Sequence, residues 1–213
     1  MKFSVVIPTR GDVDLTEIIA SYDNIADEVL IWDNSKREDL SVYGRCAMIA
    51  EARNDLIVTQ DDDCIISDPM AIVDAWWDKW HYAENYHPMG GDKGVVCNMP
   101  PEFRHDLYTE HALVGFGAVF HRDAPKRAFT RMAQATKTIH TGGPRLDEVY
   151  AFNRTCDVAF TTLTPRVLVD VPRRNLWWAE DTTRMYRQAN HVHERQKMLE
   201  LCLQIRDTPE AGA

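Results

Sequence analysis

The chain has 213 residues, of which 45% are hydrophobic and 27% are charged, and its formal net charge is −9. This size and composition indicate a globular domain with a sizeable core, and the acidic balance argues against a protein that coats nucleic acid along a broad basic face. No window is apolar for long enough to span a membrane, and the apolar run at the amino terminus is too short for a signal sequence.

The five cysteines are odd in number and scattered, and they form no CxxC pair. This pattern favours reduced thiols in a cytoplasmic setting and gives no indication of a zinc cluster. We find no repeat, low-complexity segment or linker. The sequence therefore predicts a single domain over residues 1–213.

The first part of the chain alternates short apolar strands with amphipathic helices. β-Branched runs predict strands over residues 3–8, 28–35 and 55–60. Apolar residues at helical spacing predict helices over 14–25 and 44–53. This strand–helix alternation is typical of a parallel sheet with helices on its faces.

Polar residues end or directly follow each of these three strands. Ligands of such sheets bind outside the carboxyl ends of the strands, so we expect the polar side chains there to converge in one crevice. They are Thr9 and Arg10, then Asp33, then the triplet Asp61, Asp62 and Asp63.

The second part of the chain continues with mixed elements. A helix is predicted over 68–85, with Asp68 as N-cap and Pro69 in its first position. Trp76 and Trp80 share a face of this helix, which favours core packing over sugar stacking. Strands are predicted over 93–100, 115–122 and 166–172, and a helix over 184–207 with a break near Asn190.

The aspartate triplet lies between two apolar runs, "LIVT" and "CII". Carboxylates placed together in such a setting are costly to bury unless a cation offsets their charge. Oxygen ligands suit a hard divalent ion such as Mg²⁺ or Mn²⁺. A solvated acidic turn is the alternative, and we favour the metal site.

Several segments together resemble a known family. "SVVIPTRGD", "EVLIWDNS" and "GRCAMIAEARNDLIVTQDDD" resemble the amino-terminal half of GT-A glycosyltransferases, in particular glycosyltransferase family 2 with its DxD motif. "GFGAVFHRD" and "LDEVYAFNRTCDVAFTTLTPRVLVDVP" resemble later segments, so the resemblance spans residues 3–172. It implies an α/β fold of the GT-A, Rossmann-like kind, with a mostly parallel central sheet flanked by helices and a carboxyl-terminal helix. Residues 1–100 would bind the nucleotide sugar, 101–180 would form the acceptor and catalytic half, and 181–213 would be a helical tail.

The resemblance also implies an activity and its residues. The reaction would move a sugar from a nucleoside-diphosphate sugar, with UDP favoured, to an acceptor hydroxyl with inversion. Thr9 and Asp33 would contact the base and ribose, and Arg45 would lie near the base or diphosphate. The full nucleotide site would comprise Pro8, Thr9, Arg10, Asp33, Arg45, Asp61 and Asp62.

The metal, Mn²⁺ or Mg²⁺, would be bound by Asp63 and would stabilise the departing nucleoside diphosphate. Many enzymes of this family add a carboxyl-terminal histidine ligand, and His191 and His193 are the candidates. Residues two apart on a helix point to different sides, so at most one of them can be a ligand unless the helix starts between them.

The general base implied by the resemblance is Asp157, which matches the second letter of the family's "ED" pair. Cys156 stands where the family has glutamate. Asp181, in "WWAEDTTRM", is the runner-up. Each has a structural alternative, a helix-capping carboxylate for Asp157 and a first-turn carboxylate of the tail helix for Asp181.

Two other functions remain as alternatives. A sugar nucleotidyltransferase is disfavoured because "PTRGDVD" has one glycine where that class has a glycine-rich loop. A module that binds nucleotide sugar without catalysis is the other.

The acceptor is open among a saccharide, a lipid carrier, a protein side chain and a hydroxylated nucleobase. Trp177 and Trp178 could contact a sugar or the acceptor. Basic residues that could meet an anionic acceptor, unless they are simply solvated, are His121, Arg122, Lys126, Arg127, Arg131, Arg173 and Arg174.

Overall fold

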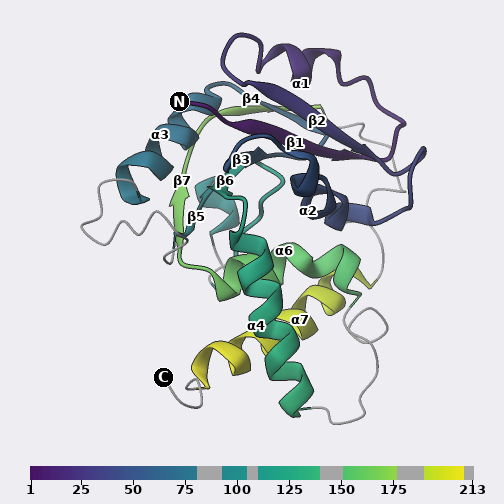
Figure 1. The fold of residues 1–213 in the computed structure, drawn as a ribbon, viewed down its shortest axis with the longest axis vertical. Helices are drawn as coiled ribbons and strands as arrows, with labels where there is room; N and C mark the ends of the chain where they lie inside the picture. Colours follow the sequence, from purple (N-terminus) through teal and green to yellow (C-terminus); the bar gives the residue numbers. More distant parts are fainter. Residues whose placement is uncertain (81–92, 105–109, 140–150, 177–189, 209–213) are drawn as a thin grey trace.

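A computed structural model of the chain describes residues 1–80, 93–104, 110–139, 151–176 and 190–208. A six-stranded sheet forms its centre, in the order β2-β1-β3-β6-β5-β7 (Figure 1). The strands are β1 (Ser4–Thr9), β2 (Glu28–Asp33), β3 (Leu56–Thr59), β5 (Val95–Asn98), β6 (Ala118–His121) and β7 (Arg166–Val169).

All strands of this sheet except β6 run in one direction. β1 pairs in parallel with β2 and β3, and β5 pairs in parallel with β7, whereas β6 is antiparallel to both β3 and β5. The expected mostly parallel sheet is confirmed. The carboxyl ends of five strands and the beginning of β6 therefore share one edge.

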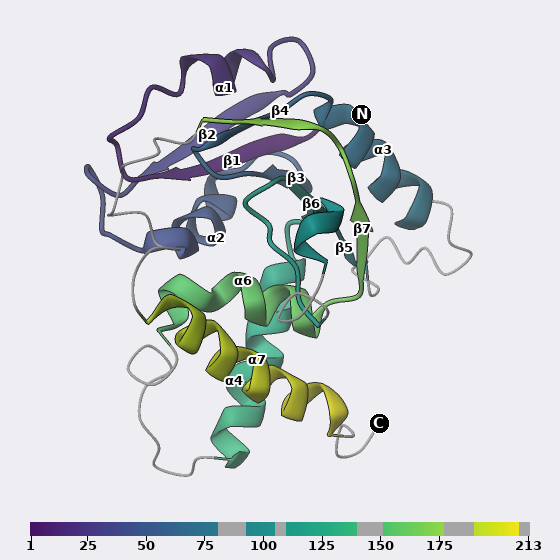
Figure 2. The same cartoon turned by 180° about the vertical axis from the view of Figure 1, so that it is seen from behind.

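Helices cover both faces of the sheet. They are α1 (Thr16–Ala20), α2 (Gly44–Met48), α3 (Pro69–Trp80), α4 (Ala124–Ile139), α6 (Phe152–Leu163) and α7 (His191–Asp207). Figures 1 and 2 show α4, α6 and α7 together on one side, with α1 and α3 away from them. Three short 3₁₀ turns, Ser41–Tyr43, Ile49–Glu51 and Pro101–Phe103, complete the described helical segments.

The alternation of side chains along each strand divides the core into two layers. Val6 and Ile57 pack toward α4, α6 and α7, while Val5 and Val58 pack toward α1 and α3. The tail helix α7 belongs to the first layer, where Met198 and Cys202 are fully buried.

A second, two-stranded sheet was not predicted. Its strands are β4 (Cys64–Ile66), directly after the triplet, and β8 (Arg173–Asn175), and they pair antiparallel. Each strand is three residues long, too short for hydrophobic periodicity to reveal.

Most predicted elements are present with shorter boundaries. The first helix ends at Ala20 instead of residue 25, and turns centred on Tyr22 continue the chain to Ala26. The Asp68 cap of α3 is confirmed, because its Oδ1 accepts a hydrogen bond from the Ala71 amide at 3.2 Å. Trp76 of α3 is buried in the core, as expected. The parts of the predicted helices at 81–85 and 184–189 lie outside the described residues.

Candidate functional site

The ends of β1 and β3 meet at the shared edge of the sheet. The Thr9 hydroxyl donates a hydrogen bond of 2.7 Å to Oδ2 of Asp62, and both residues are buried. This bond connects the first strand to the aspartate triplet across 53 residues of sequence. The expected convergence of Thr9 with the triplet is therefore present.

Asp33 closes the same edge from β2, where it is the register partner of Thr9. Its carboxylate accepts hydrogen bonds from the Ser35 amide and hydroxyl and pairs with Lys36 at 2.7 Å. The Lys36 and Ser35 contacts lower the pKa of Asp33 to about 2. Gly11 has φ +81°, and a Cβ there would lie 2.6 Å from Oδ1 of Asp33, so the turn after β1 requires glycine.

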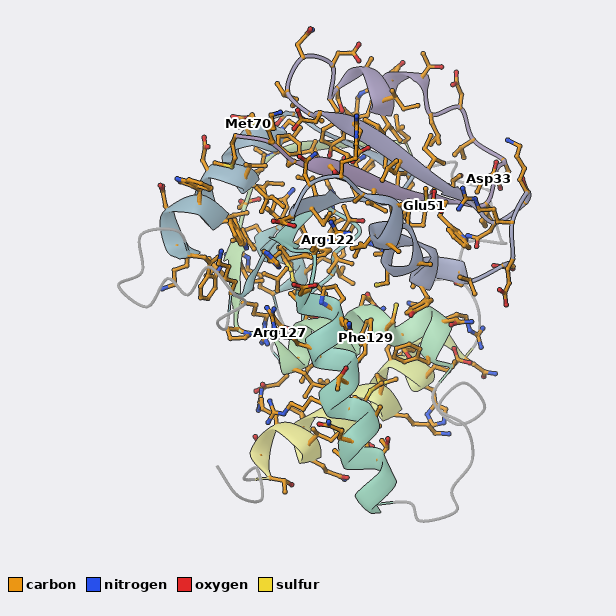
Figure 3. All side chains as sticks on the ribbon, viewed as in Figure 1. Asp33, Glu51, Met70, Arg122, Arg127 and Phe129 are labelled. Atoms are coloured by element: carbon orange, nitrogen blue, oxygen red, sulfur yellow. The ribbon has the colours of Figure 1, made fainter. Side chains whose placement is uncertain are left out.

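The other residues of the predicted nucleotide site differ in position. Pro8 is buried within β1. Arg10 lies past the end of the strand, where its side chain is about one-third exposed and pairs with Asp12 at 2.5 Å. In Figure 3, Asp33 lies far from Met70 at the start of α3, which places this end of the sheet away from that helix.

Arg45, in the first turn of α2, reaches the triplet directly. Its Nη2 lies 2.5 Å from Oδ1 of Asp61, and its Nε donates to the Val42 carbonyl at 3.0 Å. The arginine side chain is 4% exposed. Burial disfavours the guanidinium charge, but Asp61 and Asp157 outweigh that effect and raise the pKa of Arg45.

Gly115 supports the other side of Asp61. Its carbonyl accepts a hydrogen bond from the Asp61 amide at 2.8 Å, and a Cβ on Gly115 would lie 2.0 Å from Oδ2 of Asp61. Only a residue without a side chain fits against the carboxylate in this arrangement. The glycine that precedes β6 is therefore part of the site.

Asp157 lies in the middle of α6 and is buried. The alternative role of Asp157 as a helix-capping carboxylate is therefore wrong, because α6 begins five residues earlier at Phe152. Nη1 of Arg195, on α7, lies 3.0 Å from Oδ1 and 2.9 Å from Oδ2 of Asp157. Burial opposes ionisation of this carboxyl, but the charges of Arg195 and Arg45 outweigh it and lower the pKa of Asp157.

The two arginines place opposite charges alternately through the interior. Asp61 pairs with Arg45, Arg45 interacts electrostatically with Asp157, and Asp157 pairs with Arg195. A second pair, Arg154 of α6 with Glu194 of α7, lies at 2.5 Å in the neighbouring turns. The series Asp61, Arg45, Asp157 and Arg195 thus joins the triplet to the tail helix through alternating charges.

Cys156, where the resembled family has glutamate, faces α2. Its contact with the Cys46 side chain and its burial raise the pKa of the Cys156 thiol well above the usual value. The thiol is therefore neutral at pH 7 and cannot replace a glutamate charge. All five cysteines of the chain are free thiols.

The candidate histidine ligands occupy the first turn of α7. His191 is half-buried, and its burial together with the Arg195 charge lowers its pKa. His193 is exposed. The helix begins at His191, so both residues lie within it and point to different sides, and the limit of one ligand holds. Asp181, Trp177 and Trp178 lie outside the described residues.

The predicted basic residues divide between two edges of the sheet. His121 pairs in register with Leu56 at the beginning of β3, and the Arg122 amide donates to the Asp55 carbonyl. The group from His121 to Arg131 therefore begins at the edge opposite the triplet; Arg122 and Arg127 are labelled in Figure 3. Arg173 and Arg174 lie on β8, whose partner β4 begins directly after the triplet.

Three participants were not singled out from the sequence. Arg195 is one of many charged residues in the tail, and His111 and Asn98 have no distinguishing motif. His111 is buried near Asp157, and Asn98 ends β5 at the shared edge. Contacts between distant parts of the chain bring these three residues to the site. No local sequence pattern predicts such contacts.

The donor set at the triplet fits a hard divalent ion. Its side-chain ligand atoms are carboxylate oxygens. The backbone of Gly115 lies close to one side of the Asp61 carboxylate and leaves no space there for a further side chain. Within the described ranges, no three His, Cys, Asp or Glu side chains are arranged as a complete metal cage. A magnesium-like ion needs only one or two protein carboxylates, because water and phosphate oxygens supply its other ligands. No described helix is long and apolar enough to cross a membrane.

No family profile and no curated protein matches the chain. Solved structures do match it. One is glucosyl-3-phosphoglycerate synthase from Mycobacterium tuberculosis in complex with Mg²⁺ and uridine diphosphate. It is 12% identical with a TM-score of 0.46, and the match covers 99% of this chain and 81% of that one. S. aureus TarS 1–349 in complex with UDP-GlcNAc is 14% identical with a TM-score of 0.40, covering 80% of this chain and 56% of that one. Because the identities and TM-scores are low, the function proposed for this chain rests on its own residues.

Proposed function

We propose that the chain is a metal-dependent glycosyltransferase that moves a sugar from a nucleoside-diphosphate sugar, with UDP as the favoured nucleotide, to an acceptor hydroxyl. The observation that carries the proposal is the meeting of Thr9, Asp33 and the triplet at one edge of a mostly parallel sheet. This is the edge at which α/β sheets bind their ligands. Its acidic character calls for a cation between the protein and an anionic nucleotide.

Each residue of the edge has a role in this proposal. Thr9 and Asp33 bind the base and ribose, and Arg45 holds Asp61 in place beside them. Asp63 binds Mg²⁺ or Mn²⁺, and His191 is the favoured additional ligand because its lowered pKa keeps the imidazole neutral. When bound, the ion offsets the negative charge that grows on the departing diphosphate.

The acceptor hydroxyl then attacks the anomeric carbon, the bond from that carbon to the phosphate oxygen breaks, and a base takes the hydroxyl proton. Inversion by this direct attack is the proposed course. Asp157 is the proposed base, with Asp181 as runner-up. The Arg195 ion pair keeps Asp157 ionised and also makes it a weak base, so Asp157 becomes a stronger proton acceptor when Arg195 moves away from it.

We propose a single domain with the nucleotide half in residues 1–100, the acceptor half in 101–180 and the tail in 181–213. The contribution of α7 to the core supports the inclusion of the tail in that domain. The free thiols support a reducing, cytoplasmic compartment. Saccharide, lipid, protein and hydroxylated nucleobase acceptors all remain within the proposal.

The test is donor hydrolysis without any added acceptor. A panel of nucleoside-diphosphate sugars is incubated with the protein and Mn²⁺ or Mg²⁺, and the released nucleoside diphosphate is measured. A glycosyltransferase slowly transfers the sugar of its own donor to water, and chelation of the metal stops the release. If one donor binds by calorimetry but is never hydrolysed, the chain is a binding module. If nothing binds, the proposal is wrong.

A further inference from the structure

Of the predicted basic residues, Arg173 and Arg174 are the pair at the triplet side of the molecule, and their environments differ. Arg174 is exposed and forms an ion pair with Glu17. Arg173 is half-buried, and among the described residues no carboxylate lies within ion-pair distance of it. Its Nε is buried and has no hydrogen-bond partner there. A partly desolvated cation without a counter-ion is costly, so this guanidinium requires an explanation.

Backbone pairing places the strand that carries Arg173 beside the segment that follows the triplet. β8 runs antiparallel to β4, with Arg173 opposite Ile66 and Asn175 opposite Cys64. The next residue, Leu176, donates its amide to the Asp63 carbonyl at 2.6 Å. The strand that carries Arg173 therefore ends against the aspartate proposed to bind the metal.

The guanidinium of Arg173 lies over an aromatic ring. Its Cζ lies 3.8 Å from the ring centroid of Phe116 and 5.7 Å from that of Phe103. The two rings contact each other with centroids 5.2 Å apart. Stacking fixes the plane of a guanidinium while its N–H groups remain available at the edge, an arrangement suited to paired hydrogen bonds with phosphate or carboxylate oxygens.

Asn98, at the end of β5, holds both sides of this stack. Its Nδ2 donates to the carbonyls of Phe116 and Val171 at 3.0 Å each, and its Oδ1 accepts the Val171 amide at 2.8 Å. Phe116 in turn follows Gly115, which packs against Asp61. Adjacent residues, Gly115 and Phe116, thus contact the Asp61 carboxylate and the Arg173 guanidinium.

We propose that Arg173 binds an anionic group, a phosphate or carboxylate, of a substrate at the triplet edge. The inference rests on the proposed function and adds to it a residue that selects for substrate charge on the acceptor half of the chain. The anion has two sources, the diphosphate of the donor or an acidic group on the acceptor. The second source would restrict the open acceptor classes to those that carry a negative charge next to the reacting hydroxyl.

Three variants test the proposal. Arg173→Met keeps an apolar stem on Phe116 and removes the charge, Arg173→Lys keeps the charge without the planar fork, and Arg174→Met is the matched control on the adjacent position. Thermal unfolding of each variant identifies any loss of fold. Calorimetric titrations with Mg²⁺ then use UDP, uridine and inorganic phosphate as probes.

If the donor diphosphate is the anion, Arg173→Met weakens UDP binding about tenfold or more while uridine binding is unchanged. If the acceptor supplies the anion, UDP binding is unchanged and binding of inorganic phosphate to the UDP-loaded protein is lost. Arg173→Lys retains part of either effect, and Arg174→Met shows neither. The proposal is overturned if Arg173→Met binds UDP and phosphate like the unmodified protein and differs only in its unfolding temperature. If the unmodified protein binds no UDP, the proposed function fails, and phosphate binding alone decides the role of Arg173.

Discussion

Arg195 and Asp157 form a buried ion pair between α7 and α6, in which one guanidinium nitrogen lies within 3.0 Å of both carboxylate oxygens. Both side chains are less than one-tenth exposed. The pair connects the tail helix to the proposed base and, through Arg45, to the triplet. A residue far along the chain thus influences the protonation of the site.

Loss of the Arg195 charge should change the pH dependence of activity. The folded pKa of Asp157 is lowered, chiefly by the Arg195 charge acting against burial, so Asp157 stays ionised below the usual carboxyl range and the acid limb of kcat/KM lies there too. Arg195→Gln removes the largest stabilising charge and should raise that limb by about one unit or more. The pH profile of donor hydrolysis checks this, with Lys197→Gln, an exposed residue two positions along α7, as control. An unchanged limb in Arg195→Gln would assign the base to another residue.

The same pair should contribute to stability in a defined pH range. The stabilisation is present above the unfolded pKa of an aspartate, near 3.9, and is lost as the pH falls through the lower folded value. At pH 7, Arg195→Met leaves Asp157 buried without its partner and should cost about 3–5 kcal/mol of unfolding free energy. The double variant with Asp157→Leu should recover much of this. If the double variant loses the sum of the unfolding free energies lost by Arg195→Met and Asp157→Leu, the two residues are not coupled.

Gly115 should be intolerant of a side chain for a reason specific to Asp61. Gly115→Ala places a methyl group against the Asp61 carboxylate, which must move away from Arg45. We expect a loss of about 1–3 kcal/mol in stability and weaker UDP binding. In an Asp61→Ala background the same substitution should have little effect, because the obstructing carboxylate is absent. Equal effects in both backgrounds would mean that the glycine acts elsewhere.

His191 should make the protein less stable in mild acid. Burial lowers its folded pKa, so its contribution is full above the unfolded value near 6.5 and is lost as the pH falls from there to the folded value. His191→Gln should reduce the loss of unfolding free energy between pH 7.5 and 5.5, and the exposed His193→Gln should leave it unchanged. Chemical denaturation at both pH values measures the difference. If His191→Gln instead loses more unfolding free energy over this pH range, the pKa of His191 is raised by folding and not lowered.

The parallel part of the fold was predictable because buried strands and amphipathic helices produce local patterns. The runs ending at Thr9, Asp33 and Gln60 reveal both the strands and the edge where their polar ends meet. The antiparallel direction of β6 and the short β4–β8 sheet depend on long-range pairing, so no window of sequence contains them.

The site was predictable to a similar extent. Thr9, Arg45 and the triplet carry motif signals, and the structure brings them together. The environment of Asp157 was not predictable, since its partner Arg195 lies 38 residues away in a charge-rich helix. The basic stretch at 121–131 was grouped with Arg173 by composition alone, and the sheet separates them because β6 runs in the opposite direction.

The metal assignment of Asp63 is tested by one substitution. Asp63→Ala should make UDP affinity the same in Mn²⁺ and in a chelator, because the carboxylate that binds the ion is absent. Asp74→Asn, which removes an exposed charge from α3, is the control and should preserve the metal dependence. Metal-dependent binding that survives in Asp63→Ala would move the ion to other ligands.

The most direct measurement is an anomalous difference map from crystals grown with Mn²⁺ and UDP. The account predicts a manganese peak between the Asp63 carboxylate and the diphosphate oxygens, with the uridine lying along Thr9 and Asp33. A nucleotide bound elsewhere, or a manganese peak remote from the triplet, would contradict it.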